Sequence, residues 1–109
     1  MVSRFEIYLL NMDDTVATPP GDARNTRPCV VVSPDELNRH VATAIVAPIS
    51  STRATYPTRV EIDFLNGRRH VILDQIRTVD ANRLVKKVGE LDPESRKKIL
   101  DTLAELFAE

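Results

Sequence analysis

The part of the sequence that most constrains the fold is Asn25-Thr26-Arg27-Pro28-Cys29-Val30-Val31-Val32-Ser33-Pro34. Its three consecutive valines are β-branched and have no polar residue between them, which predicts a strand buried on both faces. Pro28 suits the first position of such a strand, where the missing N–H costs no ladder hydrogen bond. Arg27 therefore stands at the entrance of a rigid core strand, after a long polar loop.

Arg27 has two interpretations at this point. A planar, permanently charged donor on a rigid support suits the binding of a phosphate or a carboxylate. It also suits an ordinary surface arginine whose stem lies along a sheet edge. The stretch alone leaves both open.

Length and composition predict one soluble globular domain spanning residues 1–109, since the chain is 42% hydrophobic and 28% charged. Neither a run of membrane-spanning length nor a signal-peptide core is evident, so we expect a cytoplasmic protein that makes no membrane contact. The single cysteine, Cys29, is expected to be a small buried hydrophobe. One cysteine and two separated histidines provide no metal-ligand spacing, so no metal or other cofactor is expected.

The charge distribution is uneven although the net charge is only −1. Residues 21–89 hold 11 Arg/Lys and 7 Asp/Glu, a local net charge of +4, and the two ends together carry −5. The central part of the chain could present a basic face to an anionic partner. Charges scattered around a barrel explain the same numbers.

The remaining pattern predicts a mainly β fold, a small and partly open antiparallel barrel closed by one C-terminal helix. Short strands are expected at 5–11, 43–47, 59–64 and 68–73, with polar strand-like segments over 74–80 and 81–87. We expect Pro48 to end the second of these strands. The helix is expected from Asp92, with an apolar stripe that packs on the barrel or on a partner: Ile99, Leu100, Leu103, Leu106 and Phe107.

Asn66-Gly67 is a strong hairpin signal. If those two residues form the loop, Ile62 faces Val71 and Asp63 faces His70 on the outer side. We interpret Asp63 and His70 as a cross-strand charge pair, not a catalytic dyad.

Two loops contain candidate site residues. Asp22 lies in the loop over 12–26, five residues before Arg27, where the two could form an acid/base pair or only a solvent-exposed ion pair. Ser50, Ser51 and Thr52 group hydroxyls at a strand end, a composition that can hold a phosphate but is also ordinary for a loop.

The sequence resembles the MazF/PemK (Kid) family of toxin–antitoxin endoribonucleases over nearly its whole length. Five pieces carry the resemblance in the same order at compatible spacing: Glu6 to Thr15, Thr26 to Pro34 with Asn38, Thr43 to Ser51, Pro57 to Ile62, and Asp74 to Asp80 with Arg83-Leu84 and the terminal helix. The resemblance favours the anion-binding interpretation of Arg27.

This resemblance implies an SH3-like barrel of the CcdB/MazF type that works as a homodimer. It implies metal-independent cleavage of single-stranded RNA. It also implies a cognate antitoxin whose disordered C-terminal tail covers the groove.

Carried over by position, Arg27 matches the family's catalytic arginine and Ser50 stands where many members have threonine. Asp22 falls where a loop glutamate precedes that arginine, and Asp74 matches an aspartate implicated in one branch. The loop departs from the family pattern around Pro19-Pro20. Ile72 stands where that branch has a second catalytic arginine, so its acid/base scheme cannot be transferred whole.

Recognition of RNA is expected to depend on hydrogen bonds more than on stacking, because the chain has no tryptophan and five aromatic residues. The residues expected to contact RNA are Thr26, Ser51, Thr52, Arg53, Tyr56, Gln75 and Arg77. Two alternatives stay open: a CcdB-like gyrase-directed toxin and a non-catalytic antitoxin-binding module on the same fold.

Overall fold

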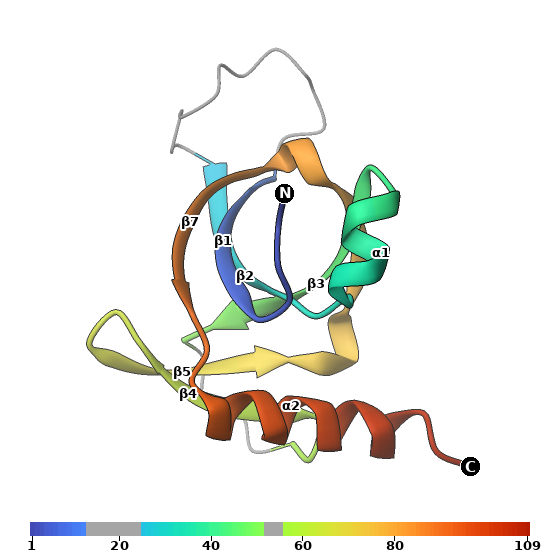
Figure 1. Ribbon diagram of the computed structural model, residues 1–109. Helices are drawn as coiled ribbons and strands as arrows, with labels where there is room; N and C mark the ends of the chain where they lie inside the picture. The colour runs from blue at the N-terminus through green and yellow to red at the C-terminus, as the bar shows by residue number, and fades with distance from the viewer. Residues whose placement is uncertain (13–24, 52–55) are drawn as a thin grey trace.

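The fold is a strongly curled antiparallel sheet with one long helix packed against its lower part (Figure 1). The computed structural model describes residues 1–12, 25–51 and 56–109. The strands are β1 (Glu6–Asn11), β2 (Thr26–Val31), β3 (Thr43–Ser50), β4 (Arg59–Phe64), β5 (Gly67–Ile72), β6 (Arg77–Asp80) and β7 (Leu84–Glu90). The helices are α1 (Asp35–His40) and α2 (Pro93–Leu106), with single turns of 3-10 helix at η2 (Leu73–Gln75) and η3 (Ala81–Arg83). The predicted mainly β, partly open barrel with a C-terminal helix is confirmed.

The strand order is β4-β5-β3-β2-β1-β7, and β6 pairs with the first half of β3. Strand β3 changes partners along its length, because Val46 to Pro48 pair with β2 whereas Ile49 and Ser50 pair with β5. The prediction that Pro48 ends this strand is wrong. A proline is tolerated in a sheet only where a ladder bond can be spared, and Pro48 is the last residue of β3 that pairs with β2.

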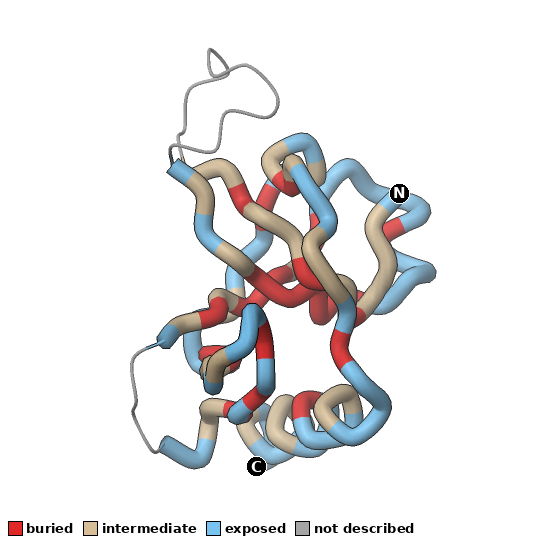
Figure 2. Tube along the Cα trace, turned by 90° about the vertical axis from the view of Figure 1, so that its left-hand side faces the viewer, coloured by how far each residue is buried: buried red, intermediate tan, exposed pale blue. Residues whose placement is uncertain are grey.

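The valine strand is buried on both faces, as predicted. Val30 and Val31 are 0% exposed and Val32 is 5% exposed. Val30 and Val32 belong to the core cluster that includes Ile99 of α2, whereas Val31 belongs to a second cluster with Cys29. The buried residues accordingly run through the middle of the molecule in Figure 2.

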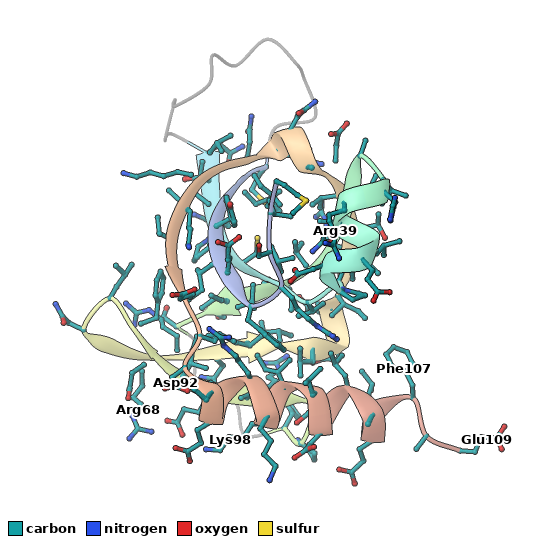
Figure 3. The ribbon with its side chains drawn as sticks, viewed as in Figure 1. Arg39, Arg68, Asp92, Lys98, Phe107 and Glu109 are labelled. Carbon is teal, nitrogen blue, oxygen red and sulfur yellow. The ribbon has the colours of Figure 1, made fainter. Side chains whose placement is uncertain are left out.

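Helix α2 begins as the sequence predicts. The Asp92 carboxylate accepts a hydrogen bond from the Ser95 amide at 2.7 Å, which lowers the pKa of Asp92, and Pro93 occupies the first turn (Figure 3). The apolar stripe is only partly covered: Ile99 is fully buried, but Leu100 is 39% and Phe107 70% exposed. None of the helices in the described residues is long and apolar enough to cross a membrane.

The β4–β5 hairpin forms with a different register from the predicted one. The loop is Leu65-Asn66, with φ of 51° and 57°, so Phe64 pairs with Gly67 and Asp63 with Arg68. The predicted pairing of Asp63 with His70 is therefore wrong. The register differs by two residues, and a shift of two keeps each side chain on its face, so the buried face is still the predicted one.

The turn at Leu65 generates a stability prediction. A left-handed backbone is costly for leucine and less so for asparagine. Because Leu65 is 69% exposed, replacing its side chain removes little buried apolar surface. We expect Leu65→Asn to raise the free energy of unfolding by about 1 kcal/mol in urea titrations. Leu65→Ala is the matched control, because it removes the same side chain but keeps the strained geometry. An equal gain in both variants would contradict this explanation.

Candidate functional site

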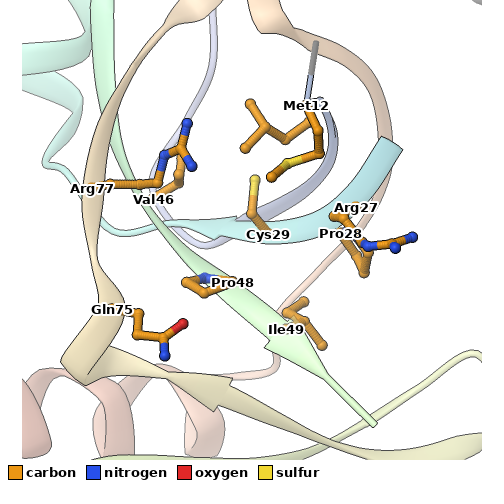
Figure 4. Close-up of a pocket in the computed structure, with 10 residues that line it drawn as sticks. Met12, Arg27, Pro28, Cys29, Val46, Pro48, Ile49, Gln75 and Arg77 are labelled. Carbon is orange, nitrogen blue, oxygen red and sulfur yellow. The ribbon is translucent and has the colours of Figure 1, made fainter. Parts of the chain in front are cut away.

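A pocket opens where β2 and β3 separate. The two strands are paired at Cys29 and Pro48, and beyond that pair β3 continues to β5 instead. The pocket at this divergence of the two strands has a volume of about 200 Å³. Its lining is mostly apolar but includes the long polar side chains of Arg27, Gln75 and Arg77. The full set of lining residues is Leu10, Met12, Arg27, Pro28, Cys29, Val46, Pro48, Ile49, Gln75 and Arg77 (Figure 4).

The polar residues of the pocket come from two directions. Arg27 lies at the edge formed by β2, and Gln75 and Arg77 lie on the opposite side, at η2 and β6 (Figure 4). The sequence placed all three among the candidate site residues, and the fold brings them to one pocket. No signal in the linear sequence indicated that Met12 and Cys29 would lie between them.

Arg27 and Arg77 are both exposed, and within the described residues neither has an ion-pair partner. Arg68 of the β4–β5 hairpin differs, because it pairs with Glu61 at 2.9 Å and with Asp63 at 3.2 Å. Two guanidinium groups without neutralising carboxylates at one pocket are an arrangement that attracts an anion.

The backbone holds Arg27 in place on one side. Arg27 and Thr26 pair with Leu10 and Asn11 of β1, and Pro28 pairs with Leu9. The guanidinium therefore extends from a fixed strand, which agrees with the rigid support expected from Pro28.

The hydroxyl candidates are placed only in part. Ser50 is the last residue of β3, half-buried, and lies directly opposite His70 of β5. It lies two residues beyond the last β2–β3 pair, as Arg27 does, and it does not line the pocket itself. Ser51 follows it and is exposed. Asp22, Thr52 and Arg53 lie outside the described residues.

Asp74 lies in a separate cluster beside the pocket. Its carboxylate accepts a hydrogen bond from the Thr58 hydroxyl at 3.0 Å and lies 3.7 Å from Nε of Arg59. The Arg59 guanidinium in turn lies over the ring of Tyr56, 4.7 Å from its centroid. The sequence analysis singled out Asp74 and Tyr56 but missed Thr58 and Arg59. The hairpin was the sequence signal that could have revealed this cluster. It brings the start of β4, at Thr58 and Arg59, beside the end of β5, which Asp74 follows.

Cys29 forms part of the pocket wall and is 2% exposed. Burial raises the pKa of its thiol to about 12, and the nearby Arg77 charge and a backbone hydrogen bond at Tyr8 offset only part of that rise. The expectation of a small buried hydrophobe is confirmed. Among the described residues, no group of three or more His, Cys, Asp or Glu side chains could hold a metal ion.

The fold and the site define a class of protein: small, curled SH3-like β-barrels with a cationic pocket at the point where two strands diverge. The chain belongs to the family of PemK-like, MazF-like toxins of type II toxin–antitoxin systems, whose model matches residues 3–107. It is 35% identical to the endoribonuclease EndoA of Bacillus subtilis strain 168, over 94% of this chain and 91% of that protein. It is 32% identical to the endoribonuclease MazF of Staphylococcus saprophyticus, over 91% of this chain and 85% of that protein.

Solved structures of this family share the fold. An endoribonuclease in complex with its cognate antitoxin, from a mycobacterial species, superposes with a TM-score of 0.78 at 27% identity, covering 96% of this chain and 93% of that one. A MazE–MazF complex from Deinococcus radiodurans gives a TM-score of 0.77 at 21% identity, covering 98% and 95%.

The burial of Cys29 predicts an unreactive thiol. Since the thiolate is the reacting species and the pKa of Cys29 is raised to about 12, we expect negligible reaction with Ellman's reagent at about pH 8 in the folded protein. The same sample in guanidinium chloride should release one equivalent of product. Rapid labelling of the folded protein would contradict the closed pocket wall described above.

Proposed function

We propose that this protein is a sequence-selective, metal-independent endoribonuclease toxin of a type II toxin–antitoxin system. It cleaves single-stranded RNA, mRNA in the cell, and so inhibits translation and growth. The relatives named endoribonuclease support this activity. The observation that carries the proposal is the pocket that Arg27 and Arg77 border without ion-pair partners among the described residues.

The proposed reaction begins with in-line attack of the ribose 2′-oxygen on the adjacent phosphorus. A bond forms between O2′ and phosphorus, the bond from phosphorus to the 5′-oxygen breaks, and the 2′ proton leaves as the 5′-oxygen gains one. The products are a 2′,3′-cyclic phosphate and a 5′-hydroxyl end. RNA supplies its own nucleophile in this chemistry, so no metal-activated water is required.

Arg27 is proposed to neutralise the charge that develops on the pentacovalent phosphate, and Ser50 to donate a hydrogen bond to a non-bridging oxygen. Preorganised donors of this kind contribute most where charge develops. Arginine is a poor acid because of its high pKa, so we assign Arg27 an electrostatic role. Asp22 is the proposed general base.

Asp74 is proposed to act as a positioning residue instead of a proton carrier. Its carboxylate is already engaged by Thr58 and Arg59, and this engagement fixes the turn that carries Gln75. That assignment differs from the catalytic role that the family resemblance suggests for Asp74.

Selection among RNA sequences is proposed to come from Gln75 and Arg77 inside the pocket and from Tyr56 and Arg53 beside it, with Thr26, Ser51 and Thr52 positioning the backbone. Unstacked bases expose hydrogen-bonding edges that such side chains can read. Tyr56 is 59% exposed and has Arg59 over its ring. The tyrosine ring is proposed as one flat surface on which a base can stack.

The remaining proposals concern partners and location. We propose a cytoplasmic homodimer controlled by a cognate antitoxin whose disordered, partly acidic tail occupies the Arg27 and Arg77 pocket. One of the mycobacterial endoribonucleases was solved with its cognate antitoxin. Antitoxin binding without RNA cleavage would instead favour a non-catalytic module.

Replacing Arg27 tests the electrostatic role. We expect Arg27→Ala to lower the cleavage rate on a single-stranded transcript by at least about 10²-fold with the folded state unchanged. Arg39→Ala is the matched control, because Arg39 is an exposed arginine on α1 and does not line the pocket. Cleavage by Arg27→Ala at the parent rate would remove Arg27 from the mechanism.

Replacing the nucleophile tests the chemistry independently of the protein. A substrate with 2′-deoxyribose only at the mapped cut site should bind but not be cleaved, because the attacking oxygen is gone. Excess EDTA should leave cleavage of the all-ribose substrate unchanged. Cutting of the deoxy-substituted site, or loss of activity in EDTA, would require a different mechanism.

A further inference from the structure

His70 lies in a row of outward-facing residues that crosses three neighbouring strands. It is directly opposite Ser50 of β3 on one side and Glu61 of β4 on the other. Val71 and Ile49, the next pair along, are buried in the core, so His70 and Ser50 point to the other face of the sheet. Side chains directly opposite each other in an antiparallel pair have Cβ atoms about 5 Å apart. The imidazole is thus the immediate neighbour of the proposed catalytic hydroxyl.

The two ring nitrogens of His70 have different surroundings. Nδ1 is buried and has no hydrogen-bond partner, whereas Nε2 is not among the buried unpaired atoms. A buried N–H without an acceptor is rare in proteins because it costs free energy. Nδ1 therefore has no room for an external acceptor, and Nε2 is the ring nitrogen that can donate a hydrogen bond to a ligand.

The charged side chains next to His70 on β4 are already paired with other charged groups. Glu61 is opposite His70, but its carboxylate is paired with Arg68 at 2.9 Å. Arg68 also binds Asp63 at 3.2 Å, and Arg59 is the next β4 residue on the same face. On β3 the facing residue is Ser50, which carries no charge.

We propose that His70 is a further catalytic residue, which donates a hydrogen bond from its Nε2–H to a non-bridging oxygen of the scissile phosphate beside Ser50. This rests on the proposed ribonuclease function and deepens it. The role of the imidazole is to add a donor that is fixed in place by the strand, on the side of Ser50 away from the pocket.

The experiment compares His70→Ala, His70→Gln and His70→Asn on one in vitro transcript of mixed sequence, with cut sites mapped by primer extension. The glutamine amide nitrogen can occupy the place of Nε2, and the asparagine amide that of Nδ1. We expect His70→Ala and His70→Asn to lose about 10²-fold in cleavage rate and His70→Gln to stay within about 10-fold of the parent. His40→Ala, at the exposed histidine of α1, is the control and should cleave at the parent rate. Thermal melts verify that each variant is folded.

The comparison of the three variants decides the proposal. Full activity in His70→Ala would overturn it, and so would better activity in His70→Asn than in His70→Gln, because only the glutamine amide nitrogen can occupy the place of Nε2. An inactive parent would instead refute the proposed ribonuclease function, and with it the role of His70.

Discussion

The separation of β2 from β3 beyond the Cys29–Pro48 pair is the constraint on which the site depends. Up to that pair the two strands share a ladder; beyond it β3 pairs with β5, whereas β2 keeps only its other neighbour, β1, with which it pairs from Thr26 to Val30. Proline at position 48 removes a donor at the point where this exchange occurs. The resulting wedge contains an apolar pocket, with Arg27 held on one side by β1 pairing. Without the divergence, Arg27 would lie over a continuous sheet.

Charge pairing divides the surface into two kinds of region. On the β4–β5 hairpin Arg68 is paired with Glu61, and on β7 Lys87 is paired with Glu6. Around the pocket, the arginines from β2 and β6 lack such matches in the described part of the chain. A net charge of −1 is thus compatible with a locally cationic site. The position of the acids, more than their number, determines where an anion can bind.

The sequence predicted the parts of the fold that local physics controls. The valine strand, the Asp92 cap and the C-terminal helix follow from β-branching, capping and periodicity, and each is present. The hairpin was predicted with the wrong loop because Asn66-Gly67 is the stronger local turn signal. The observed Leu65-Asn66 loop pairs Phe64 with Gly67 and leaves Val60, Ile62 and Phe64 on the buried face that was predicted. Contacts that depend on how the whole sheet is arranged could not be predicted from the spacing of residues in the sequence. They are the Asp74 contacts with Thr58 and Arg59, the position of Ser50 opposite His70, and the change of strand partner at Pro48.

The burial of β2 in both core clusters has a consequence for how the molecule opens. Val30 and Val32 contribute to the cluster that includes α2, and the intervening Val31 contributes to the one that includes Leu84 of β7. A fluctuation that detached this strand would expose both clusters at once, so its amides can exchange with solvent only through near-global unfolding. The wall of the pocket is therefore part of the slowest-exchanging, most cooperative unit of the protein.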